Sequence, residues 1–312
     1  MRRVVALLAA VLSLALSACG GDGAEPGASN EATLVLDFTP NAVHSGIYAA
    51  LERGWFAEEG LDLEIQPPGS ATDAPKLLAA GRTDFAVMDI NDLGTAANRG
   101  FELEPIGALV QVPLASVIAA DRDQIRQPRD LEGGEVGVTG LPSDDAVLDA
   151  IVEADGGDPG QVDRTVIGFD AVAALSAGRL DAATAFWNAE GVALRELGVP
   201  TREFRVGDFA SGPFPELVVV TAAELADAEP ELVEAMQAGL ERGYELAADE
   251  PDAALDELLS AVEGLERLNQ GAQMGALSEA DAFSAGATPG SLDPGRYANW
   301  EQFARANGIA VP

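Results

Sequence analysis

Short apolar segments with strand character alternate with helical segments twice along this chain, and this alternation constrains its fold more than any other feature. Strands are expected at 33–37, 61–65, 84–88, 103–110, 135–138, 162–168, 182–186 and 217–221. The pattern pauses at Pro113 and then restarts. Strands that alternate with helices form parallel or mixed sheets with helices on both faces, so the sequence predicts an α/β fold.

Helices are expected between these strands and through the C-terminal part of the chain. Amphipathic spacing predicts a long helix over 231–248, whose buried stripe consists of Leu232, Met236, Leu240 and Tyr244. The remaining helices are expected at 47–56, 73–80, 91–99, 144–153, 171–177, 190–197, 252–262 and 296–305. The C-terminal part is therefore a helical tail that has to pack on one of the sheets.

Two strand–helix units predict two lobes with mixed sheets. We expect residues 33–112 and 215–312 in the first lobe and residues 113–214 in the second. The chain would cross between them at 110–116 and return at 206–215, where prolines and glycines concentrate. Ligands of open α/β sheets bind beyond the carboxyl ends of the strands, so a ligand is expected in the cleft, with the crossovers as hinges.

The N-terminus has the organisation of an export signal. Met1-Arg2-Arg3 precedes an apolar stretch over 4–16, and Leu16-Ser17-Ala18-Cys19 matches the lipobox of bacterial lipoproteins. The expectation is a signal peptide over 1–18, a lipid on Cys19 and a flexible tether over 19–32. The alternative is ordinary cleavage that leaves a stray cysteine. The lipidated protein would lie outside the cytoplasm, anchored to the cell membrane only by its acyl chains.

The charge excludes several classes of partner. The chain has 52 acidic and 18 basic residues, for a formal net charge of −34. Nucleic acid and anionic bilayers are both recognised through basic residues, so neither is an expected partner. Because Cys19 is the sole cysteine, a disulfide within one chain is impossible. We expect a monomer.

Several segments resemble the ThiY-type pyrimidine-precursor binding proteins of ABC transporters, within a superfamily that also binds sulfonates and nitrate. These segments are Leu36-Asp37-Phe38-Thr39-Pro40-Asn41 with His44, Gly54-Trp55-Phe56 through Gly60-Leu61-Asp62, 80–87, Phe186-Trp187-Asn188-Ala189-Glu190-Gly191-Val192 and 213–218. Phe38 stands where the nearest members of that family usually carry Trp. The resemblance covers residues 33–225 and implies a type II periplasmic-binding-protein fold. It also implies a monomeric binding protein that delivers a heterocycle to a permease and its ATPase.

The resemblance implies formylaminopyrimidine or hydroxymethylpyrimidine as the ligand, in the cleft between the lobes. Phe38 and Trp187 would stack on the flat ring, and Glu190 would accept a hydrogen bond from the exocyclic amine. Asn41 and His44 would read the remaining edges. Each residue also has a structural reading: core packing for the aromatic residues, a charge at a helix start for Glu190, and a cap or space filler for His44.

Three further polar residues follow expected strands at the cleft. Asp89 and Asp92 come after the strand at 84–88 and could face the ligand, or could be solvated or capping residues. Ser143 precedes the helix at 144–153, where an N-cap is the role that its position favours. Backbone N–H groups at that helix start could also hold a polar group of the ligand.

The same superfamily contains a pyrimidine synthase, an enzyme with a lysine that carries pyridoxal phosphate and with a cysteine-rich iron motif. The matching stretches here, 85–90 and 211–216, contain no lysine and no cysteine. Because a Schiff base needs an amine and the iron motif needs thiolates, we expect neither catalysis nor a cofactor. The sole histidine gives no pair for a metal such as zinc. Two other ligand classes stay open: a sulfonate- or nitrate-like anion, and a larger flat vitamin such as riboflavin.

Overall fold

The computed structural model describes residues 30–66, 74–121, 124–210 and 212–312. The signal peptide, Cys19 and most of the tether lie outside the described residues. The strands are β1 Asn30–Val35, β2 Leu61–Gln66, β3 Phe85–Asp89, β4 Leu103–Ala108, β5 Ala115–Ala120, β6 Glu135–Val138, β7 Asp163–Val166, β8 Ala182–Phe186, β9 Thr201–Arg205 and β10 Leu217–Ala222. Strand β1 begins three residues before the expected start of the first strand.

The helices fall mostly where the pattern predicts them. The α-helices are α1 Ser45–Glu52, α2 Trp55–Glu58, α3 Ala74–Ala79, α4 Ile90–Asn98, α5 Pro142–Ala154, α6 Ala171–Ser176, α7 Glu190–Glu196, α8 Ala223–Ala228, α9 Pro230–Asp249, α10 Pro251–Ala261, α11 Arg267–Glu279 and α12 Pro294–Ala306. Short 3-10 turns are η1 Ala42–His44, η2 Pro128–Leu131, η3 Pro159–Gln161 and η4 Val206–Asp208. The single helix expected at 47–56 is two helices, because Gly54 adopts a left-handed φ of 72° between them.

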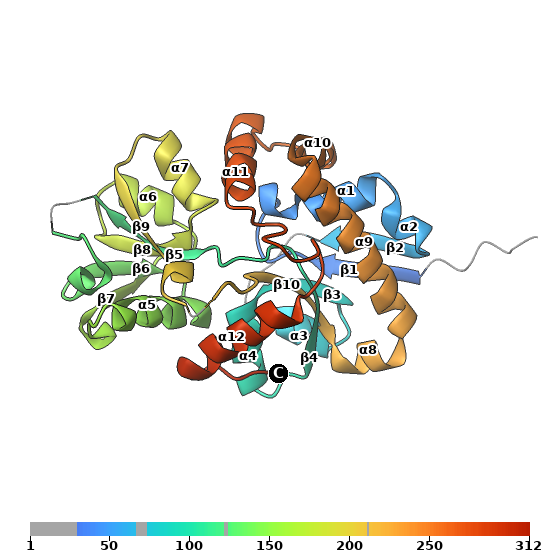
Figure 1. Ribbon diagram of the computed structural model, residues 1–312, viewed down its shortest axis with the longest axis horizontal. Coiled ribbons are helices and arrows are strands. Elements are labelled where there is room, and N and C mark those ends of the chain that lie inside the picture. The colour runs from blue at the N-terminus through green and yellow to red at the C-terminus, as the bar shows by residue number, and fades with distance from the viewer. Residues whose placement is uncertain (1–29, 67–73, 122–123, 211) are drawn as a thin grey trace, which may run out of the picture.

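Two five-stranded sheets form two lobes that lie side by side (Figure 1). The strand orders are β2-β1-β3-β10-β4 and β7-β6-β8-β5-β9. In each sheet, four strands run in the same direction, and one antiparallel strand arrives from the other lobe: β10 in the first sheet and β5 in the second. The two sheets therefore share one topology, and the fold is the α/β fold that was predicted.

Strands β5 and β9 are missing from the sequence prediction. Strand β5 is almost wholly buried, as a strand with neighbours on both sides and helices over its faces has to be. Its residues therefore show no apolar–polar alternation. Strand β9 is an edge strand with mostly charged residues, and Phe204 is its only buried side chain.

The predicted stripe on α9 packs against the helix at the start of the first lobe. Leu232, Met236, Leu240 and Tyr244 are all buried, which confirms the prediction for this helix. The hydroxyl of Tyr244 donates to the carbonyl of Val43 at 2.9 Å. This bond holds η1, which follows β1 at the edge of the cleft, so the C-terminal tail supports the first lobe's ligand-facing loop.

The lobes also touch away from the sheets. Helix α11 of the tail lies against α7 of the second lobe (Figure 1). There the side-chain amide of Asn269 donates to Glu196 at 2.7 Å. Among the helices of the described ranges, none is long and apolar enough to cross a membrane.

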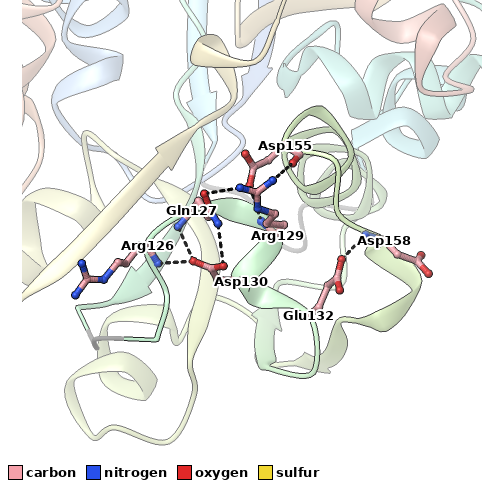
Figure 2. A network of polar contacts seen from close by, with 7 residues as sticks. All are labelled: Arg126, Gln127, Arg129, Asp130, Glu132, Asp155 and Asp158. Carbon is pink, nitrogen blue, oxygen red and sulfur yellow. Dashed lines mark hydrogen bonds and ion pairs between the residues drawn. The ribbon is translucent and has the colours of Figure 1, made fainter.

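A polar network fixes the chain between β5 and β6 against α5 (Figure 2). Asp130, in the first turn of η2, accepts the backbone N–H groups of Arg126 and Gln127 at 2.9 and 3.1 Å. These donations, with that of Arg126 the largest, lower the pKa of Asp130. The backbone N–H of Arg129 donates to Asp155 at the end of α5, at 3.1 Å. The network secures the end of the second lobe through hydrogen bonds to the backbone.

Candidate functional site

A cavity of about 120 Å³ lies between the two sheets. Its wall is formed by the segments that follow β1 and β3 in the first lobe and β6, β7 and β8 in the second. All five strands are parallel strands, and their carboxyl ends face the cavity, where a ligand is expected in this class of sheet.

Five of the seven predicted ligand-binding residues line this cavity. They are Phe38, Asn41, Asp89, Ser143 and Glu190, and Asp92 joins them. The structure therefore brings together residues more than 150 positions apart in the sequence. His44 and Trp187 are not among the described residues that line it.

His44 is fully buried behind the cavity wall and supports a residue that does line it. Its Nδ1 accepts the backbone N–H of Asn41 at 3.2 Å, so the ring proton of the neutral imidazole is on Nε2. That Nε2–H donates to the carboxylate of Asp37 at 2.9 Å. The side chain of Asn41 caps η1 by accepting from Val43 at 3.1 Å. His44 thus orients Asp37, a cavity residue that the sequence prediction omitted.

Asp89 both caps α4 and faces the cavity. Its Oδ1 accepts the backbone N–H of Asn91 at 2.7 Å, and its carboxyl lies near that of Glu216. Burial, and then the neighbouring charge of Glu216, raise the pKa of Asp89 well above its usual value. Glu216 accepts the backbone N–H groups of Leu114 and Ala115 at 2.6 and 2.9 Å. Glu216 therefore connects the cavity to the first crossover between the lobes.

Asp92 joins the lobes across the cavity. Its Oδ1 accepts the backbone N–H of Ser143 at 3.2 Å, from the first turn of α5. Burial, and then the charge of Asp89, raise the pKa of Asp92 to about 8. Asp144 is also buried, which raises its pKa despite hydrogen bonds from Thr139. The N-cap reading of Ser143 is wrong, because Leu141 occupies the N-cap and Pro142 is the first helical residue.

Glu190 combines its two predicted roles. It is the first residue of α7, and its Oε2 accepts the backbone N–H of Phe186 at 3.0 Å. It also lines the cavity, and burial raises the pKa of its carboxyl. The second carboxyl oxygen is thus the part of Glu190 that a ligand could contact.

Trp187 belongs to the core at the crossover. Its side chain is 2 % exposed, its indole N–H donates to the carbonyl of Pro113 at 3.0 Å, and the guanidinium of Arg205 lies 4.3 Å from the ring centre. These surroundings do not suit the expected stacking on a ligand, because Arg205 covers one face of the indole and its N–H is already hydrogen-bonded. The neighbours of Trp187 on both sides, Phe186 and Asn188, line the cavity instead.

Besides Asp37, the cavity residues Phe169 and Asn188 had no predicted role. Phe169, in the loop between β7 and α6, packs its ring against Phe38 with centroids 5.0 Å apart. Its position directly after an expected strand, at the carboxyl edge of the second sheet, was the one sequence feature that could have indicated a place in the cleft. Asn188 is buried, and its Oδ1 finds no hydrogen-bond partner among the described residues.

The cavity is acidic and apolar. Five carboxyl residues line it, namely Asp37, Asp89, Asp92, Asp144 and Glu190, and the described lining contains neither lysine nor arginine. Carboxyl groups with raised pKa values can be protonated at neutral pH and then both donate and accept. Within the described residues, no cluster of three or more potential metal-ligating His, Cys, Asp or Glu side chains occurs.

Comparison with known proteins identifies similar sequences and folds. The model of the NMT1/THI5-like family matches residues 41–254. The formylaminopyrimidine-binding protein of Halalkalibacterium halodurans is 32% identical over 259 residues, covering 83% of this chain and 78% of that protein. A 4-amino-5-hydroxymethyl-2-methylpyrimidine phosphate synthase of Legionella pneumophila is 26% identical, covering 73% of each chain. The alkanesulfonate-binding protein SsuA of Xanthomonas axonopodis, solved with MOPS, superposes with a TM-score of 0.69 at 16% identity over 93% of this chain and 96% of that one.

Proposed function

The chain belongs to the NMT1/THI5-like family, and from this premise we propose that it is the solute-binding component of an ABC importer for an aminopyrimidine. The ligand would be formylaminopyrimidine or hydroxymethylpyrimidine, bound in the cavity between the lobes. The observation that carries the proposal is the wall of this cavity, which combines five carboxyl residues with the rings of Phe38 and Phe169. The binding-protein relative from Halalkalibacterium halodurans supports the same ligand class.

The hydrogen-bonding groups of the cavity suit an aminopyrimidine. The edge of such a ring presents an amine N–H donor beside a ring-nitrogen acceptor. A protonated carboxyl offers the complementary O–H donor and carbonyl acceptor. Asn188 adds a buried oxygen with no partner among the described residues, and leaving such an acceptor unpaired costs about 1–3 kcal/mol. A ligand N–H directed at Asn188 would recover that energy.

The same wall disfavours the two other ligand classes. Sulfonate and nitrate are anions, which proteins bind with arginines or several helix N-termini. Here they would meet Asp37, Asp144 and Glu190 instead. Riboflavin has a three-ring system and a ribityl chain, and it would need more of the cavity than a single six-membered ring with small substituents does.

The proposal includes location and partners. Lipid on Cys19 would hold the protein outside the cytoplasm, and a monomer would deliver its ligand to a permease and ATPase. Residues 33–112 with 215–312 would close against residues 113–214 when the ligand binds. Retention in the detergent phase of a Triton X-114 extract, lost in Cys19→Ser, tests the anchor independently of the ligand.

A thermal-shift series tests the ligand. The purified protein is melted with formylaminopyrimidine, hydroxymethylpyrimidine, riboflavin, taurine or nitrate, since a ligand of the native state raises the melting temperature. We expect a shift with one of the two pyrimidines, and no shift with the same pyrimidine in Glu190→Gln. Glu64→Gln, at an exposed position on β2, is the control. A shift with taurine or nitrate alone would overturn the proposed ligand and leave the fold unaffected.

A further inference from the structure

Phe169 is the most exposed aromatic side chain of the cavity wall. It lies between β7 and α6, its side chain is 51% exposed, and it follows Gly168, whose left-handed φ of 57° turns the chain before it. Isolated exposed apolar residues are common on protein surfaces, but this one lines a cavity and packs against a ring of the other lobe. The exposed part of the Phe169 ring is therefore available for contact with a ligand in the cavity.

The rings of Phe38 and Phe169 are the closest aromatic contact between the lobes that the described residues show. Their centroids are 5.0 Å apart and their planes are tilted by 56°. Neither residue belongs to a hydrophobic core cluster of the described structure, whereas Phe186, a third ring of the cavity, packs against two of them. Phe38 and Phe169 are thus free to change their separation when the lobes move, without disturbing the packing of either core.

We propose that Phe38 and Phe169 form an aromatic clamp that holds the flat ring of the ligand from both sides, with Phe169 as its specificity-determining half. This inference rests on the proposed function. Two phenyl rings that sandwich a third ring have centroids about 7 Å apart, since stacked carbon atoms lie ~3.5 Å from one another. The contact of 5.0 Å then has to widen by roughly 2 Å, and the two rings have to become parallel.

The clamp selects ligands by the thickness of their ring and couples ligand binding to closure of the lobes. Because its halves come from different lobes, a ligand touches both only when the lobes are together. A planar ring fits a slot one ring thick, whereas a puckered, non-aromatic ring with the same heavy atoms is too thick and lacks the π face. The acidic groups on the wall recognise the edge of the ligand, and the clamp recognises its face.

Calorimetric titration of the purified protein with hydroxymethylpyrimidine and with its tetrahydro analogue, whose ring is neither aromatic nor planar, tests the clamp. The variants are Phe169→Ala, Phe169→Tyr and Phe38→Leu, and Val166→Ala is the control, an exposed apolar residue of the same lobe that does not line the cavity. We expect Phe169→Ala to weaken pyrimidine binding by about ten- to hundredfold. It should also remove the preference for the planar ring, while Phe169→Tyr and Val166→Ala retain both.

Two results separate the possible failures. If the wild-type protein binds the pyrimidine, and Phe169→Ala changes neither the affinity nor the preference for the planar ring, the clamp is wrong and the proposed function stands. If the wild-type protein binds taurine and neither pyrimidine, the proposed function is wrong and the clamp fails with it. Melting of each variant without ligand should match the wild type, because Phe169 lies outside the core.

Discussion

His44 donates from Nε2 to Asp37 at 2.9 Å, and this pair holds a carboxylate at the cavity wall. The histidine itself is fully buried, so it acts on a ligand only through the cavity residues it holds, Asp37 and Asn41. His44 is therefore a positioning residue. The sequence had suggested either direct contact with the ligand or a cap or space filler.

His44→Ala should weaken both folding and binding. It removes a buried ring and a hydrogen bond to a charged group, so we expect the free energy of unfolding to fall by about 2–4 kcal/mol. Urea unfolding measures the loss. Asp37→Asn is the informative partner, because its amide oxygen can still accept from Nε2 while the charge is gone. If Asp37→Asn and His44→Ala leave the affinity for the pyrimidine unchanged, the pair has no part in binding.

Asp92 should make the protein less stable as the pH rises. Its pKa of about 8 in the fold lies above the ordinary value near 4 of an unfolded chain, so the folded protein binds more protons in between. The contribution of Asp92 to the free energy of unfolding is then most favourable below about pH 4 and is lost as the pH rises through 8, by up to about 1.4 kcal/mol per pH unit. Asp89 and Asp144, which face Asp92, contribute in the same direction.

Chemical unfolding of Asp92→Asn between pH 5 and pH 8 checks this dependence. The variant should lose part of the pH dependence and be more stable than the wild type at pH 8. Asp62→Asn, which removes an equal charge from an exposed position on β2, is the control for the net charge of the chain. Equal pH slopes in the wild type and Asp92→Asn would show that Asp92 is ionised throughout this range.

Glu216 should matter for the crossover through its oxygens rather than its charge. Glu216→Ala leaves the backbone N–H groups of Leu114 and Ala115 buried without an acceptor, at about 1–3 kcal/mol each. Glu216→Gln retains an acceptor for both and should lose much less. Guanidinium unfolding of the two variants measures the difference, and equal losses would contradict this role.

Trp187 should affect stability and leave ligand affinity unchanged. Trp187→Phe removes the hydrogen bond to the carbonyl of Pro113, which we expect to cost about 1 kcal/mol of unfolding free energy. The phenyl ring retains the contact with Arg205. A loss of pyrimidine affinity as large as that of Phe38→Leu would restore the stacking role that the sequence favoured.

Helices and strands could be predicted where one face is buried and the other is exposed. Helix α9 has one buried and one exposed face, so the stripe from Leu232 to Tyr244 was visible in the sequence. Strand β5 is buried on both faces and lacks that signature. The break between α1 and α2 depends on the left-handed conformation of Gly54. Glycine permits this conformation but also adopts others, so the sequence did not predict the break.

The site could be predicted less completely, because a motif gives residue types and not their surroundings. Glu190 and Trp187 lie three residues apart in one segment, yet only Glu190 reaches the cavity. Phe169 belongs to no motif, and its pairing with Phe38 depends on how the two lobes meet. The sequence likewise could not show that His44 acts through Asp37, since that contact requires the fold of η1.

Calorimetric titration of the wild-type protein with hydroxymethylpyrimidine and formylaminopyrimidine, beside taurine, tests the central claim most directly. We predict saturable binding of one pyrimidine in a 1:1 ratio, lost in Glu190→Gln, and no heat of binding with taurine. Saturable binding of taurine, with neither pyrimidine bound, would contradict the assignment of this acidic cavity to an aminopyrimidine.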